Sequence, residues 1–142
     1  MRGLCLAGII VQCVWALPNA AFAQPATKED SVKELAYQKV WEPMIPDFIY
    51  SELAFDCGVR TLQWHASVEN YLIDKIADAS VRIWGREQAI VMEGSNQDAG
   101  VNAAEQATVY ADSMPASACG GAGLTTRLPG LDTLAAKASK SQ

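Results

Sequence analysis

Apolar residues recur at intervals of three and four through most of the chain, which is the spacing that buries one face of an α-helix. The clearest stripe lies between residues 60 and 84 and consists of Trp64, Val68, Leu72, Ile76, Ala79 and Ile83. No segment alternates apolar and polar residues for more than a few positions, so β-strands are not indicated. We therefore expect an all-α fold, a small bundle of four to five helices.

Residues that start and stop helices divide this pattern into elements. Thr27, with an acidic residue three positions later, predicts the start of the first helix. Pro43 and Pro46 predict its end, and a second helix begins near Pro46. Gly58 is a candidate end of the second helix, and Gly85 either ends the third helix or kinks it.

The C-terminal half contains weaker signals. Residues 86–93 again show a helical pattern, and Asp98 is a candidate cap for a helix over residues 99–113. A proline and a glycine within residues 124–131 predict a broken connection there. A short last helix, capped by Asp132, is then expected to end at Ala138.

Residues 1–23 have the pattern of a secretory signal peptide. A positive charge at Arg2 precedes a short apolar run, and the small residues Ala21 and Ala23 flank a cleavage site. The run is shorter than the about 20 residues of a membrane-spanning helix. The alternatives are an uncleaved anchor and a lipoprotein modified at Cys13, although Gln12 stands where lipoprotein signals have a small residue.

Cleavage would leave residues 24–142, which are enough for a single helical domain with a frayed C-terminal tail. We expect this domain to be periplasmic or secreted and to have no membrane span. Cys57 and Cys119 are the two cysteines outside the signal, and an even pair in an exported chain favours a disulfide. A closed loop of this length contributes about 4 kcal/mol in the chain-entropy model.

The charge balance narrows the possible partners. The chain has a formal net charge of −5, and no basic stripe that would bind nucleic acid. Residues 87–126 contain no Lys or Arg. The acidic residues of this segment are Glu87, Glu93, Asp98, Glu105 and Asp112. Together they predict a negative field that steers a basic partner; the alternative is an alanine-rich packing segment with a mildly acidic face.

Two tryptophans, Trp41 and Trp84, lie at predicted helix ends and are the aromatic candidates for contact with a partner. His65 is the only histidine, and Glu69 lies four residues later on the same helix face. A zinc site needs three or four ligands, and the chain offers no second histidine and no free thiol. We therefore expect an ion pair on the helix surface, with no metal site, no cofactor and no catalytic residue.

These observations favour a small exported helical protein that acts by binding another envelope or secreted protein, as a subunit, inhibitor or immunity-type partner. One alternative is a carrier of a small molecule or lipid, with a pocket lined by Phe48, Phe55, Trp64 and Leu72. Another is an enzyme that uses His65 with Glu69 or Asp74. A structural envelope protein without a specific partner is the fourth.

The export hypothesis predicts the mass of the protein isolated from its native host. The intact mass should correspond to a chain that starts at Gln24, and two thiols should become available for alkylation only after reduction. A mass that starts at Met1, with free thiols, would contradict both export and the disulfide.

Overall fold

The structure, a computed structural model, describes residues 27–94 and 98–140, and the regular elements of these residues are all helices. The α-helices are α1 (Lys28–Trp41), α2 (Ile45–Asp56), α3 (Leu62–Trp84), α4 (Arg86–Gly94), α5 (Ala99–Asp112) and α6 (Ala122–Ala138). Short 3-10 turns, η1 (Glu42–Met44) and η2 (Ala116–Gly120), lie before α2 and α6. The all-α fold class and the disulfide between Cys57 and Cys119 are confirmed.

The predicted signal peptide, residues 1–23, lies outside the described residues, as does the middle of the polar loop between α4 and α5. Among the helices of residues 27–94 and 98–140, none combines the length and the apolar run needed to cross a membrane.

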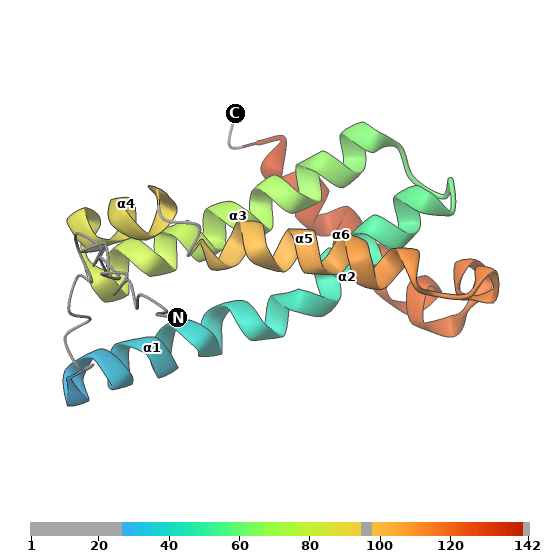
Figure 1. Ribbon diagram of the computed structural model, residues 1–142. Helices are drawn as coiled ribbons and strands as arrows, with labels where there is room; N and C mark the ends of the chain where they lie inside the picture. The colour runs from blue at the N-terminus through green and yellow to red at the C-terminus, as the bar shows by residue number, and fades with distance from the viewer. Residues whose placement is uncertain (1–26, 95–97, 141–142) are drawn as a thin grey trace, which may run out of the picture.

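Helix α3 is the centre of the bundle and contacts each of the other α-helices. In Figure 1, α1 leads into α2 along one side of α3. Helices α5 and α6 each pack against both α2 and α3. The predicted apolar stripe faces this packing, since Val68, Leu72, Ile76 and Ala79 are all buried. Burial of the stripe confirms the longest helix predicted from the sequence.

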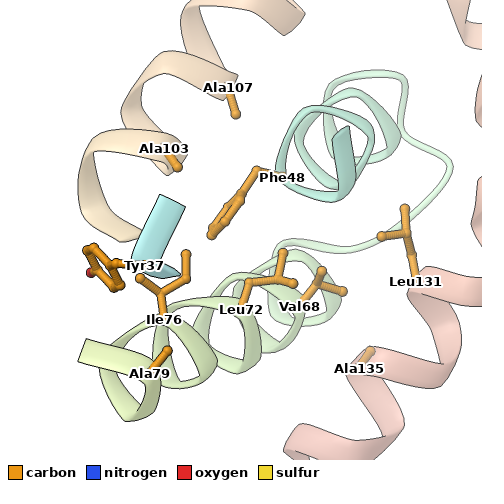
Figure 2. Packing of buried hydrophobic residues seen from close by; sticks show 10 residues of the cluster. All are labelled: Tyr37, Phe48, Val68, Leu72, Ile76, Ala79, Ala103, Ala107, Leu131 and Ala135. Atoms are coloured by element: carbon orange, nitrogen blue, oxygen red, sulfur yellow. The ribbon is translucent and has the colours of Figure 1, made fainter. Parts of the chain in front are cut away.

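Phe48 of α2 fills the space between α3 and α5. Its side chain is 1% exposed and points into the cluster formed by Leu72 and Ile76 of α3 and Ala103 and Ala107 of α5 (Figure 2). The small alanine side chains allow α5 to lie close to the aromatic ring.

A second cluster, made of Leu53, Ala54, Ala111 and Leu124, joins α2 to α5 and α6.

The predicted helix boundaries at Thr27, Gly58 and Gly85 are confirmed. Thr27 and Asp30 form a capping box, in which each side chain accepts a hydrogen bond from the backbone N–H of the other residue. Gly58 has a φ of 66° and Gly85 has a φ of 88°, both in the left-handed region that favours glycine. Each glycine therefore ends its helix where the sequence predicts.

The broken connection predicted for residues 124–131 is wrong, because α6 runs through it with Pro129 inside the helix. Proline removes one backbone hydrogen bond and is unfavourable in a helix interior. Tertiary packing offsets this cost, since Leu124 and Leu131 on either side of Pro129 are buried. The short helix predicted to start at Asp132 is therefore the second half of a longer one.

Asp132 does not cap a helix but links α6 to the start of α3. Its carboxylate accepts two hydrogen bonds from the Arg60 guanidinium, at 2.9 and 2.8 Å, and one from the Trp64 indole N–H at 2.9 Å. Mainly the Arg60 guanidinium, and to a smaller extent the Trp64 indole, hold the pKa of Asp132 below its usual value. The disulfide joins the same region covalently, from the end of α2 to η2.

Replacement of Phe48 by alanine tests the packing of α2 on α3. A buried Phe→Ala change removes apolar contacts and leaves a cavity, so we expect F48A to lower the free energy of unfolding by about 3–5 kcal/mol in urea titrations. Val109→Ala, at a side chain that is 72% exposed, is the matched control and should have little effect. A similar small loss in both variants would contradict the placement of Phe48.

Candidate functional site

His65 lies in a buried polar cluster between α2 and α3. Its side chain is 8% exposed, and both ring nitrogens have partners. Nδ1 lies 2.9 Å from the hydroxyl oxygen of Ser51, which is fully buried. Nε2 lies 2.9 Å from a carboxylate oxygen of Glu52 and 3.4 Å from one of Glu69. The predicted surface ion pair with Glu69 is thus part of a larger, mostly buried cluster.

The helix geometry explains how these four residues meet. Ser51 and Glu52 are neighbours on α2, on the same side of the helix as Phe48. Burial of Phe48 against α3 therefore brings both side chains to His65, and Glu69 reaches the same point from one turn further along α3.

The imidazole ring is held on its face as well as at its edges. The ring of Phe55 stacks on it, with centroids 5.6 Å apart and an angle of 12° between the planes. Ser51, Glu52 and Phe55 therefore fix both the position and the rotation of the His65 side chain, which is the condition for a preorganised site.

The cluster is rich in negative charge. Burial raises the pKa of the Glu52 carboxyl, His65 lowers it, and Asp56, Glu69 and Asp112 raise it further. Helix α2 contains no Lys or Arg, and neither does α5, which packs against it. His65 is therefore the main basic group that acts on Glu52, and it faces two carboxylates.

Three groups in this cluster have the arrangement of metal ligands. One oxygen of Glu52, one nitrogen of His65 and one oxygen of Glu69 all lie within 4.8 Å of one another. The expectation of no metal site rested on a missing third ligand. Glu52, which the sequence analysis did not single out, is that third group.

The residues predicted to contact a partner are distributed over the bundle. Trp41, at the end of α1, and Trp84, at the end of α3, both pack partly against the core. The indole N–H of Trp84 is buried without a hydrogen-bond partner among the described residues. These tryptophans thus contribute to packing and expose only part of their rings.

The five predicted acidic residues have different roles. Glu87 and Glu93 are exposed on α4, and Glu105 and Asp112 are exposed on α5. The Asp98 carboxylate caps α5, where it accepts hydrogen bonds from the backbone N–H groups of Gly100, at 2.8 Å, and Val101, at 3.3 Å. Asp98 therefore stabilises the helix, and the other four are available at the surface.

Phe48 and Leu72, two of the residues named for a carrier pocket, lie within the packed core. Trp64, another of them, borders an open hollow of about 340 Å³ beside Asp132, and two further concavities adjoin Tyr37. A cavity of about 350 Å³ is lined by Tyr37, Ser80 and residues of α4, and one of about 470 Å³ lies between α1 and α5. Burial raises the pKa of the Tyr37 hydroxyl, with a smaller contribution from Asp98.

No protein-family model matches the chain, and no curated protein or solved structure is significantly similar to it.

The burial of Glu52 predicts a pH dependence of stability. A carboxyl whose pKa is raised in the folded state binds its proton more tightly there than in the unfolded chain, so stability falls as pH rises above 4.5, its ordinary value. Glutamine does not titrate, so Glu52→Gln should lose less stability than the wild-type protein between about pH 4 and pH 7.

Urea unfolding in metal-free buffer at several pH values measures this difference. The control is Glu105→Gln, at an exposed position on α5. Parallel stability curves for the wild-type protein and Glu52→Gln would show that Glu52 titrates alike in the folded and unfolded chains, against expectation.

Proposed function

We propose that the protein is a small exported binding protein that recognises a basic, partly apolar segment of another envelope or secreted protein. The observation that carries this proposal is the surface of α5. Its exposed apolar residues are Val101, Val109 and Tyr110, which are 44%, 72% and 55% exposed. Glu105 and Asp112 lie beside them.

Spacing places most of these side chains on one stripe. Val101, Glu105, Val109 and Asp112 follow one another at intervals of four, four and three, so they share one face of α5. Glu105, Val109 and Tyr110 also line a shallow groove. A surface that alternates acidic and apolar groups suits a partner with Lys or Arg next to apolar side chains.

The surroundings of α5 strengthen the negative field. Neither α5 nor the neighbouring α2 contains a Lys or Arg, and α2 contributes Asp47 and Asp56 as well as Glu52. The Arg127 side chain pairs with Asp47 at 2.9 Å, and no comparable cation pair involves Glu105 or Asp112 among the described residues. Electrostatic attraction over this face would speed association with a basic partner and favour it over acidic ones.

The other functions have less support. His65 is buried between α2 and α3, which limits the access of a substrate that an enzyme would need. The carrier hypothesis loses part of its proposed lining, because Phe48 and Leu72 contact other core residues. Export itself remains part of the proposal and rests on the sequence pattern of residues 1–23.

Affinity purification from the native host tests the proposal. The tagged wild-type protein should recover one partner in near-stoichiometric amount, and the complex should weaken as the salt concentration rises because exposed charges are screened. Glu105→Lys should reduce recovery by roughly tenfold or more if Glu105 lies at the centre of the contact. The matched control is Asp74→Lys, the same charge reversal at an exposed position of α3.

Recovery of a monomeric protein without a partner would contradict the proposal. Equal recovery of a partner by both variants would contradict the assignment of the surface. Circular dichroism of the two variants should match that of the wild-type protein, because both positions are exposed.

A further inference from the structure

We propose that Glu52, His65 and Glu69 bind a divalent transition-metal ion such as Zn²⁺. The site would lie between α2 and α3, in the buried polar cluster described above. It goes beyond the recognition of a partner by α5 and does not depend on it.

The distances between the donor atoms suit a metal ion. Zn²⁺ binds imidazole nitrogen and carboxylate oxygen at about 2.0–2.2 Å in a tetrahedral arrangement, which places neighbouring donors about 3.3–3.6 Å apart. The His65 nitrogen lies 2.9 Å from the Glu52 oxygen and 3.4 Å from the Glu69 oxygen, and all three donors lie within 4.8 Å of one another. Small side-chain movements would bring them to the ligand positions.

Ser51 and Phe55 orient the histidine for this role. When Nδ1–H donates to the Ser51 hydroxyl, the lone pair of Nε2 points toward the two carboxylates. Metal-binding histidines commonly donate their second ring N–H to such a partner, which fixes the tautomer and the ring orientation. The stacked ring of Phe55 restricts the remaining rotation.

The charge of the cluster favours a divalent cation. Two carboxyl groups converge on one imidazole, and Asp56 and Asp112 add to the negative field at Glu52. A divalent ion placed between these groups would offset more of this negative charge than a monovalent ion could. The absence of Lys and Arg from α2 and α5 means that these helices supply no competing cation.

The ligand types indicate the class of metal. One imidazole with two carboxylates suits Zn²⁺ and similar transition metals, whereas Ca²⁺ and Mg²⁺ prefer oxygen ligands throughout. The sulfurs of Cys57 and Cys119 are joined in the disulfide and provide no thiolate. The Glu69 side chain is 27% exposed, so water can supply a fourth ligand from that side.

Calorimetric titration of Zn²⁺ into the purified, oxidised and chelator-treated protein tests the site. We expect saturable binding of one ion per chain at neutral pH. Glu69→Gln removes the most exposed of the three ligands and should weaken binding by roughly tenfold or more, and His65→Gln should abolish it. The control is Glu87→Gln on α4, which should bind like the wild-type protein.

Two further measurements separate a built site from surface binding. Co²⁺ should give the visible absorption of a four- or five-coordinate ion in the wild-type protein, without a thiolate charge-transfer band. At the same Co²⁺ concentration, Glu69→Gln should give a much weaker absorption. Zn²⁺ should also raise the melting temperature of the wild-type protein more than that of Glu69→Gln.

Absence of saturable binding by the wild-type protein would overturn the proposal, and so would equal binding by the wild-type protein and Glu69→Gln. Should His65→Gln fail to fold, Glu69→Gln decides the question. The Glu69 side chain is 27% exposed, so its replacement should leave the fold intact, and circular dichroism checks this. Either result leaves the partner test on α5 unaffected, since Glu69 is not on that helix.

Discussion

The packing of α2 across α3 is the contact on which the rest of the structure depends. Phe48, Ser51, Glu52 and Phe55 follow one another at helical spacing and share one side of α2. The register that buries Phe48 in the core therefore also brings the other three to His65. Apolar burial thus determines where polar groups leave water, and each of them then needs a partner to offset its lost hydration.

The sequence predicts what local chemistry determines and misses what depends on contacts between helices. The capping signal at Thr27 and the stripe of α3 are local features, and both predictions are confirmed. Pro129 is a strong local signal too, but burial on both sides of it outweighs its cost. Glu52 could not be assigned to His65 from spacing, because the two residues lie on different helices whose crossing is set by the core.

The two proposals share an electrostatic origin. Helix α2 places Glu52 against His65. Helices α2 and α5, which pack together, also carry acidic groups at the surface, and neither helix contains a Lys or Arg. An ion bound at the inner site would add positive charge beneath this surface. Its influence outside would extend over about a Debye length, roughly 8–10 Å at moderate salt. The metal site and the acidic surface thus have a common origin in the charge of α2 and α5, although either can exist without the other.

The position of the disulfide determines how the chain responds to proteolysis. The bond between Cys57 and Cys119 encloses α3, α4 and α5 in one covalent loop, while α1, α2 and α6 lie outside it. A single cut within the loop produces two fragments that stay joined until the disulfide is reduced. A single cut outside it, for example between α1 and α2, separates two pieces that only noncovalent packing keeps in place. A single proteolytic cut therefore leaves the chain covalently in one piece only when it falls between Cys57 and Cys119.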